Sequence, residues 1–479
     1  MLGELLALRE QVADEGRELL ESWRPALKRR AFLPSAVNLS HYIALRRRDV
    51  RELQEALMPL GLSSLGRCEG RVLANLDAVV ASLSVLAGKD EDDRFAHPRP
   101  ATFYRGNRLL SRHTEAVFGR ADRGREVRIM VTVSSEAEEY EFVRALLERG
   151  TDVVRINCAH DDADVWARIA RNVRRAERET RRRCPILVDL QGPRARTGRL
   201  TATGGRLFVA VGDRVQLVAH PAEGQAQLPQ IECSLPEALG QLREGHHVFY
   251  DEGSIRLVCE QAGPTSALLR VTRVESKGRV RSEKGLNFPD TPLEFDPLTP
   301  KDMADLETVA RLADVVGYSF VQHARDVARL QQELGRLAPR RTLALAAKVE
   351  TALAVRNLPE IIVQGAGAQP FAVMIARGDL AVEIGFGRLA EIQEEILWLC
   401  EAAHAPVIWA THVLDTFVRK GSHSRAEMTD AAMAERAECV MLNKGPHILE
   451  AVGVLDDVLG RMEAHQSKKT SRLRALQSW

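Results

Sequence analysis

The stretch FAVMIARGDLAVEIG, residues 371–385, carries the clearest signal of the fold of this chain. It begins as an apolar run long enough for a buried strand, and Arg377 and Asp379 follow at the point where that strand would end. An amphipathic helical pattern, AEIQEEILWLCEAAHA, comes next, and a second apolar run, PVIWATHVL, starts at residue 406. Two buried strands joined by a helix are typical of a parallel β-α-β unit.

This unit recurs between residues 127 and 465. Eight apolar runs predict strands, and most of them are followed by an amphipathic helix: VRIMVTV at 127, DVVRINCAH at 152, PILVDLQG at 185, DVVGYSFVQ at 314, LALAAKVE at 343, FAVMIARGDL at 371, PVIWATHVL at 406 and CVMLNKG at 439. Such a series predicts a (β/α)8 TIM barrel, while the pattern leaves a doubly wound open sheet as an alternative.

The series is interrupted after the third strand. Residues 199–285 lack long helical patterns and alternate apolar with polar residues in short runs, which predicts a small inserted all-β domain. Because this domain leaves the barrel at the carboxyl end of a strand, where barrel enzymes build their sites, we expect it to act as a lid. The barrel would then comprise residues 127–198 and 286–465, followed by a tail at 466–479.

Residues 1–122 are predicted to form an N-terminal helical region, because apolar residues recur at helical spacing in HYIALRRRDVRELQEALMPLGL and in GRVLANLDAVVASLSVLAG. No motif in this region indicates a chemistry. The charged, glycine-containing segment from Arg112 to Glu126 predicts a linker to the barrel.

The composition argues against several classes of protein. The 479 residues include 67 Lys and Arg against 66 Asp and Glu, a formal charge of +1, so no overall charge favours nucleic acid or an anionic membrane as a partner. The seven cysteines are scattered and form no CxxC pair, which argues against a disulfide framework and a zinc site. We find no apolar segment long enough for a signal peptide or a membrane span, and expect a cytoplasmic protein.

Polar side chains collect where the predicted strands end. In a barrel the carboxyl ends of all strands meet at one mouth, so these side chains would share one site. They are Arg155, Asn157 and His160 on the second strand, Asp189 on the third, Lys348 and Glu350 on the fifth, Arg377 and Asp379 on the sixth, and Thr411 and His412 on the seventh.

Two of these carboxylates indicate a divalent metal. Glu350 and Asp379 would converge from adjacent strands, and hard oxygen ligands suit Mg²⁺ or Mn²⁺ better than zinc. Lys348 lies on the same face of its strand as Glu350, where an ammonium can neutralise a transferring phosphoryl group or an enolate. Arg155 and Arg196 add guanidinium groups suited to phosphate oxygens. Taken singly, such residues are more often structural, as in a surface ion pair, so only their convergence indicates a site.

A set of motifs resembles the pyruvate kinase family over about residues 127–462, in the order that the family has them. The motifs are VVRINCAH, LVDLQGPRARTG, YDEGSI, EKGLNFPD, LTPKDMADL, AAKVE, MIARGDLAVEIG, VIWATHVLDT and SRAEMTD. The resemblance implies a glycolytic enzyme that transfers the phosphoryl group of phosphoenolpyruvate to ADP, giving pyruvate and ATP. It also implies Mg²⁺ or Mn²⁺ as cofactor, held by Glu350 and Asp379.

The resemblance implies roles for further residues. Lys348 would lie against the transferring phosphoryl group, while the amides of Gly378 and Asp379 and the hydroxyl of Thr411 would hold the substrate carboxylate. The residues that it places at the phosphates and the nucleotide are Arg155, Asn157, His160, Arg196 and, from the inserted domain, Lys284.

The chain departs from the family at the potassium site. Members usually hold K⁺ with an asparagine, a serine, an aspartate and a threonine; Asn157 and Asp189 are retained here, but Ala159 and Leu190 replace the other two. Arg194 replaces a frequent glutamate. We expect the guanidinium of Arg194, together with Asp189, to substitute for the monovalent ion, so that K⁺ is not required.

Other departures keep two alternatives open. The eighth strand ends in Asn-Lys-Gly-Pro at residues 443–446 in place of the family's Ser-Gly-Glu-Thr, and Ser134 and Ser135 replace a Gly-Pro. One alternative is a pyruvate or oxaloacetate aldolase or lyase on the same barrel, which would need no nucleotide. The other is a catalytically weak regulatory protein that binds phosphoenolpyruvate. Residues 424–427 match a segment near the family's subunit interface, so we expect a homo-oligomer, and we expect the family's C-terminal regulatory domain to be absent.

Overall fold

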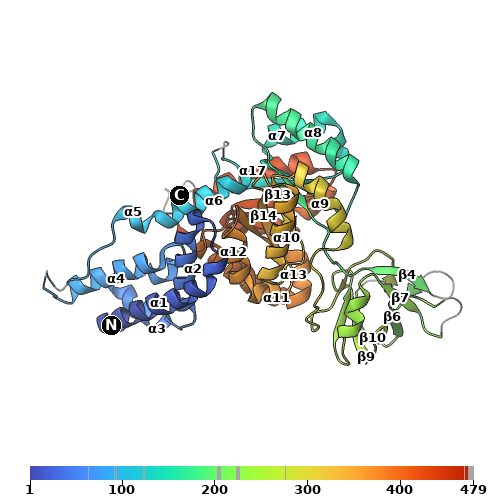
Figure 1. Cartoon of the computed structure of the whole chain (residues 1–479), viewed down its shortest axis with the longest axis horizontal. Coiled ribbons are helices and arrows are strands. Elements are labelled where there is room, and N and C mark those ends of the chain that lie inside the picture. Colours follow the sequence, from blue (N-terminus) through green and yellow to red (C-terminus); the bar gives the residue numbers. More distant parts are fainter. Residues whose placement is uncertain are drawn as a thin grey trace.

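The computed structural model describes the whole chain except residues 63, 91, 93, 122–123, 202–206, 223–226, 276, 469 and 473–479. Figure 1 shows a central barrel, with a group of N-terminal helices on one side of it and a smaller β-sheet unit on the other. Within the described part of the chain, no helix is both long enough and apolar enough to cross a membrane.

A closed barrel of parallel strands forms the centre of the molecule. Among the described residues, eight strands pair in the order β1-β17-β16-β15-β14-β13-β3-β2. Each predicted apolar run contains one of them, which confirms the (β/α)8 barrel and excludes the open sheet. The strands are β1 (Arg128–Val133), β2 (Val153–Asn157), β3 (Ile186–Asp189), β13 (Val315–Tyr318), β14 (Ala344–Val349), β15 (Phe371–Ala376), β16 (Val407–Ala410) and β17 (Cys439–Leu442).

The barrel strands are apolar throughout because both of their faces are buried. One face packs on the surrounding helices, and the other fills the barrel interior with side chains such as Met130, Leu187 and Met374, each at most 1% exposed. The surrounding helices are α7 (Tyr140–Arg149), α8 (Ala163–Thr180), α9 (Pro300–Leu312), α10 (Ala324–Leu337), α11 (Ala352–Arg356), α12 (Leu358–Ala366), α13 (Arg377–Ile384), α14 (Phe386–Ala402), α15 (Asp415–Lys420), α16 (Arg425–Met433) and α17 (Ile448–Glu463).

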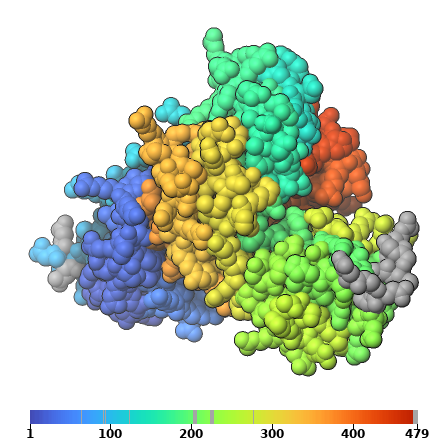
Figure 2. Space-filling model, turned by 45° about the vertical axis from the view of Figure 1, so that its right-hand side comes forward, coloured from blue at the N-terminus to red at the C-terminus, as the bar shows by residue number. Residues whose placement is uncertain are grey.

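The β insertion, which we define as residues 197–287, leaves the barrel after β3. Its described strands form one sheet in the order β12-β8-β9-β10-β6-β7-β4, with an apolar core of its own. Figure 2 shows it as a separate lobe beside the barrel. Its strands are β4 (Thr197–Thr201), β6 (Arg214–Val218), β7 (Gln230–Cys233), β8 (His247–Tyr250), β9 (Ile255–Ala262), β10 (Ser266–Val274) and β12 (Leu286–Asn287), with the short pair β5 (Leu207–Phe208) and β11 (Arg279–Val280). The limits 199–285 of an independent domain stay a prediction.

The N-terminal residues form helices, as predicted, and α2 packs against the barrel helix α14. The helices are α1 (Leu2–Trp23), α2 (Leu33–Arg46), α3 (Arg51–Leu57), α4 (Val72–Leu86), α5 (Pro100–Phe103) and α6 (Arg105–Phe118). At the other end of the chain, β18 (Gln466–Ser467) pairs with β19 (Thr470–Ser471). The predicted tail continues into residues 473–479, which lie outside the described residues.

The linker predicted from Arg112 to Glu126 is wrong over its first part, because α6 continues to Phe118. The last residues of α6, Val117 and Phe118, are 3% and 1% exposed and belong to the core of the barrel interior. Arg128, at the start of β1, donates a hydrogen bond to the carbonyl of Gly119 at 2.9 Å. Helix α6 therefore closes the amino-terminal end of the barrel and leaves the carboxyl end open for a site.

Candidate active site

Lys348 lies at the centre of a buried cluster at the carboxyl end of the barrel strands. Lys348 is a residue of β14, and its ammonium nitrogen lies 3.2 Å from Asp189 Oδ2 and 3.2 Å from Glu350 Oε1. It also donates a hydrogen bond to the hydroxyl of Ser319 at 2.6 Å. Burial alone would lower the pKa of Lys348, but the carboxylates of Asp189 and Glu350 raise it above its ordinary value. The ammonium therefore stays charged.

Asp189 joins this Lys348 cluster from the end of β3. Arg155, on β2, donates to Asp189 Oδ2 through Nε at 3.1 Å and to Thr132 Oγ1 through Nη1 at 3.0 Å. Burial would raise the pKa of Asp189, but Lys348 and Arg155 hold it below its ordinary value. The other oxygen, Oδ1, has no hydrogen-bond partner among the described residues, and a β-carbon on Gly317 would lie 2.5 Å from it. The glycine in β13 thus permits this close approach.

Glu350 and Asp379 are the candidate metal ligands. Glu350 is 2% exposed, and its Oε2 accepts a hydrogen bond from Phe320 N at 2.6 Å. Burial raises the pKa of Glu350; Lys348 opposes this shift, and the charge of Asp379 adds to it. A divalent cation bound by both carboxylates would relieve their repulsion, so the residues present fit Mg²⁺ or Mn²⁺.

Asp379 lies in the first turn of α13 rather than on β15. Its Oδ1 accepts a hydrogen bond from Arg194 Nη2 at 2.6 Å. The sequence placed Arg194 together with Asp189, but the structure pairs Asp189 with Arg155 and Lys348 instead. No group of three or more His, Cys, Asp or Glu side chains suited to a metal occurs among the described residues. Glu350 and Asp379 are thus the two candidate protein ligands, and Mg²⁺ is usually bound through one or two carboxylates together with water and substrate oxygens.

Gly378 and Thr411 follow the ends of β15 and β16 and lie next to each other. The amide of Gly378 donates a hydrogen bond to the hydroxyl of Thr411 at 2.8 Å. Thr411 has a φ of +63°, an uncommon backbone conformation for a β-branched residue, and such strain is frequent at functional sites. A β-carbon on Gly378 would lie 3.2 Å from His412 Nε2. The amide and hydroxyl predicted to bind a carboxylate are therefore adjacent.

Arg377 holds this loop in place. Its guanidinium forms an ion pair with Asp430, with Nη2 at 2.8 Å from Oδ2. It also donates to the carbonyl oxygens of Ala410 at 3.0 Å and Thr411 at 2.6 Å, and it lies 4.5 Å from the ring centroid of Trp409. This buried charge is therefore paired and supports the backbone at Thr411 instead of joining the Lys348 cluster.

The side chains of two predicted nucleotide residues form their hydrogen bond or ion pair, among the described residues, with the β insertion. Arg196 Nη1 donates to the carbonyl of Glu283 at 3.1 Å, and Lys284 Nζ lies 3.1 Å from Asp251 Oδ1. Burial lowers the pKa of Arg196, and Arg194 nearby adds to this shift. The structure therefore does not bring Arg196 and Lys284 into contact with the Lys348 cluster.

The other two predicted nucleotide residues follow β2. Asn157 Oδ1 accepts a hydrogen bond from Ala159 N at 3.0 Å, which shapes the turn that leads to His160. Burial lowers the pKa of His160, and the charge of Lys444, which follows β17, lowers it further. The cation that follows the altered eighth strand therefore disfavours protonation of His160.

Sequence reasoning missed three residues that bond directly to the cluster. Ser319 and Phe320 contact Lys348 and Glu350, and Thr132 contacts Arg155, at the distances given above. All three lie at or near the carboxyl ends of strands, so a search of the first and fourth strand ends for hydroxyl groups would have found Thr132 and Ser319. Phe320 contributes through its backbone amide, for which the sequence carries no signal.

Comparisons with known proteins agree with this geometry. The profile of the family described as "Pyruvate kinase, barrel domain" matches residues 124–447. A pyruvate kinase of Methylorubrum extorquens is 33% identical over 348 residues, which cover 71% of this chain and 69% of that protein. One of Agrobacterium vitis is 32% identical over 349 residues, covering 71% and 70%, and human pyruvate kinase PKLR is 29% identical over 359 residues, covering 71% and 60%. The chain therefore belongs to the pyruvate kinase family of phosphotransferase enzymes.

Proposed function

We propose that the protein catalyses Mg²⁺-dependent transfer of the phosphoryl group from phosphoenolpyruvate to ADP, giving pyruvate and ATP. The observation that carries this proposal is the Lys348 cluster, in which one ammonium lies 3.2 Å from each of two buried carboxylates at the barrel mouth. Phosphoryl transfer asks a protein mainly for positioning and charge neutralisation, and this cluster supports both.

Lys348 is the proposed contact of the transferring phosphoryl group. Its partners already hold the ammonium in place, so little reorganisation is needed when negative charge develops beside it. Thr411 and Gly378 are the proposed partners of the substrate carboxylate. Because they bond to each other at 2.8 Å, the carboxylate would have to replace that hydrogen bond. Arg155, which shares Asp189 Oδ2 with Lys348, is proposed to contact the same phosphate.

Glu350 and Asp379 are proposed to hold Mg²⁺ or Mn²⁺. When bound, the ion would neutralise charge on the phosphoryl oxygens and on the enolate. The hydrogen bond from Arg194 to Asp379 Oδ1, at 2.6 Å, then competes for one ligand oxygen. We therefore expect Arg194 to move or to share this carboxylate when the metal binds.

We propose that the reaction does not require K⁺. The support is chemical: Ala159 and Leu190 offer no side-chain oxygen where the family has a serine and a threonine. Arg194 brings a fixed positive charge to the same rim through its bond to Asp379. The charge on Asp189 is balanced by Arg155 and Lys348.

We propose further that Asn157, His160, Arg196 and Lys284 bind the nucleotide once the β insertion closes over the barrel as a lid. Binding of ADP would then have to draw Lys284 away from Asp251. A cytoplasmic location and a homo-oligomeric state stay predictions; the seven cysteines are buried free thiols, which suits a reducing compartment.

The test is pyruvate formation by the purified protein from phosphoenolpyruvate, ADP and Mg²⁺, beside a parallel assay without ADP. We expect turnover that requires ADP and that falls about a hundredfold or more in Lys348→Met, the cost of losing one preorganised charge-stabilising group. Lys420→Met, at the exposed end of α15, is the matched control and should keep the rate. Pyruvate formed without ADP would be hydrolysis of phosphoenolpyruvate and would contradict transfer to a nucleotide. Cleavage of oxaloacetate to pyruvate without a nucleotide would favour an aldolase or lyase, and binding of phosphoenolpyruvate without turnover would favour a regulatory protein.

A further inference from the structure

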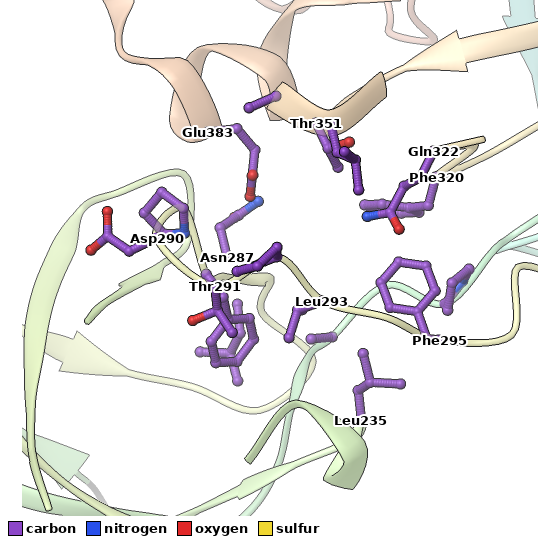
Figure 3. Close-up of a pocket in the computed structure, with 18 of the residues that line it drawn as sticks. Leu235, Asn287, Asp290, Thr291, Leu293, Phe295, Phe320, Gln322, Thr351 and Glu383 are labelled. Atoms are coloured by element: carbon purple, nitrogen blue, oxygen red, sulfur yellow. The ribbon is translucent and has the colours of Figure 1, made fainter. Parts of the chain in front are cut away.

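A cavity of about 320 Å³ lies beside the candidate active site, where the β insertion rejoins the barrel. Figure 3 shows its walls: Asn287 ends β12 of the β insertion, Leu293 and Phe295 come from the connection that follows it, and Phe320 and Glu383 come from the barrel. None of the charged residues of the Lys348 cluster lines it. Because the two walls belong to units with separate apolar cores, an occupant of the cavity would bridge them.

One end of this hinge cavity is apolar and aromatic. Leu293, Phe295 and Phe320 are only partly buried, although all are large apolar side chains, and Figure 3 shows the two rings facing the same space. Covering such surface is favourable by roughly 25 cal/mol per Å². Concave sites of this size between two structural units, mostly apolar with a few polar groups, are typical of small-molecule sites.

The other end of the hinge cavity is acidic. Glu383, one turn beyond Asp379 on α13, extends into the cavity toward the side-chain amide of Asn287 (Figure 3). Burial raises the pKa of Glu383 to about 7; Asn287 opposes this shift, and the charges of Asp379 and Asp290 add to it. Among the described lining residues, Arg356 is the one cation, and it forms no ion pair with Glu383. Asp290 is already bonded to His247 at 2.6 Å and Asp379 to Arg194, so the carboxylate of Glu383 is the group at this end that a ligand cation would pair with.

We propose that the hinge cavity is a binding site for a small aryl cation, with the protonated nitrogen group on the carboxylate of Glu383 and the aromatic ring against Phe295 and Phe320. The polar end sets the orientation of the ligand through a charge-assisted hydrogen bond, and the aromatic end supplies most of the buried area. A neutral ligand of the same shape would keep the ring contact and lose the ion pair.

An occupant of the hinge cavity would contact a residue that is hydrogen-bonded to the candidate active site. Phe320 has a φ of +56°, and its amide donates to the candidate metal ligand Glu350 at 2.6 Å. A ring packed on Phe320 would fix this strained residue, and contact with residues 287–295 would fix the β insertion on the barrel. The site is therefore suited to regulation of the proposed reaction. This regulatory role rests on the proposed function, whereas the binding of an aryl cation is independent of it.

The experiment compares benzamidine, a planar aryl cation, with its neutral analogue benzamide on the purified full-length protein. Binding is measured by ligand-observed NMR titration, and hydrogen exchange of residues 286–297 is measured with and without benzamidine. We expect benzamidine to bind at least about tenfold more tightly than benzamide, as one charge-assisted hydrogen-bonded pair implies, and to slow exchange in this segment. Glu383→Gln should remove the preference, and Phe295→Ala should weaken both ligands.

Glu395→Gln, the same change at an exposed position of α14, is the matched control and should bind like the unmodified protein. Equal affinity of the unmodified protein for the two ligands would overturn the proposal, even if a variant fails to fold. So would a preference that survives Glu383→Gln, or an absence of saturable binding at several millimolar benzamidine. None of these readouts needs turnover, so failure of the proposed enzymatic reaction would leave them interpretable.

Discussion

Lys348, Asp189 and Glu350 have almost no water to solvate their charges, because all three are at most 9% exposed. Each charge is instead compensated by its neighbours, with Arg155 as the second cation of the group. Buried ion pairs of this kind contribute little net stability compared with apolar residues, but loss of one partner leaves the others uncompensated. The cluster is therefore better explained by the chemistry proposed for it than by stability.

Removal of the lysine should destabilise the fold as well as the reaction. In Lys348→Met, Glu350 and Asp189 lose a cation at 3.2 Å, and we expect the free energy of unfolding to fall by about 3–5 kcal/mol. Adding Glu350→Gln removes one of the two carboxylates that Lys348→Met leaves without a cation, so the double variant should be more stable than Lys348→Met alone. Urea denaturation of the two single variants and the double variant checks this, and additive losses would contradict the charge compensation.

A second prediction at the residue scale concerns Arg194. If its guanidinium replaces a monovalent cation, Arg194→Ala should lower the rate about tenfold or more in the absence of K⁺, since a charge-assisted contact contributes roughly 1.5–3 kcal/mol. Adding K⁺ at constant ionic strength should restore part of the rate in the variant and should not change that of the unmodified protein. Equal rates of both proteins without K⁺ would show that Arg194 has no such role.

At the scale of elements, His404, which lies between α14 and β16, makes one of the contacts between the N-terminal helices and the barrel. Its Nε2 lies 2.9 Å from the carbonyl of Gly70, and its Nδ1 lies 2.9 Å from the hydroxyl of Ser35. A carbonyl only accepts, so Nε2 carries the proton and Nδ1 accepts from the serine. His113, on α6, lies 2.7 Å through Nδ1 from the carbonyl of His404. Both imidazoles are therefore satisfied in their neutral forms.

This contact predicts a loss of stability in acid. Burial lowers the pKa of His404 to about 4 and shifts that of His113 in the same direction. The unfolded chain takes up protons at a higher pH than the folded one, so the free energy of unfolding should fall as the pH falls from about 6.5 to 4, by roughly 3 kcal/mol for His404. Urea denaturation across this range measures the slope. His404→Gln should flatten it, and an unchanged slope in that variant would assign the acid sensitivity to other groups.

At the scale of the whole molecule, the barrel was predictable because its strands are buried on both faces and appear as continuous apolar runs of strand length. Runs such as FAVMIA and LALAAKV need no three-dimensional information to be recognised. The end of α6 was not predictable in the same way. The segment after Arg112 is rich in charge and is followed by glycine, which favoured a linker, whereas in the structure Val117 and Phe118 end α6 and pack among the side chains of the barrel interior.

The residues of the candidate site were likewise predictable only in part. Lys348, Glu350 and Asp189 could be assigned to one rim, because parallel strands in a barrel end at the same mouth. The pairing of Arg194 with Asp379 depends on the path by which the chain leaves β3, which no local pattern specifies. The distance of Arg196 and Lys284 from the cluster depends on how the β insertion sits on the barrel, and this too lies beyond sequence reasoning.

The proposed transfer of a phosphoryl group to a nucleotide at the Lys348 cluster can be followed by ³¹P NMR of a reaction mixture. The mixture contains the purified protein, phosphoenolpyruvate, ADP and Mg²⁺, without K⁺. We predict that the phosphoenolpyruvate signal disappears while the three signals of ATP grow in equal molar amount, and that Lys348→Met stops both changes. Release of inorganic phosphate without ATP, or an unchanged spectrum from folded protein, would contradict the proposed reaction.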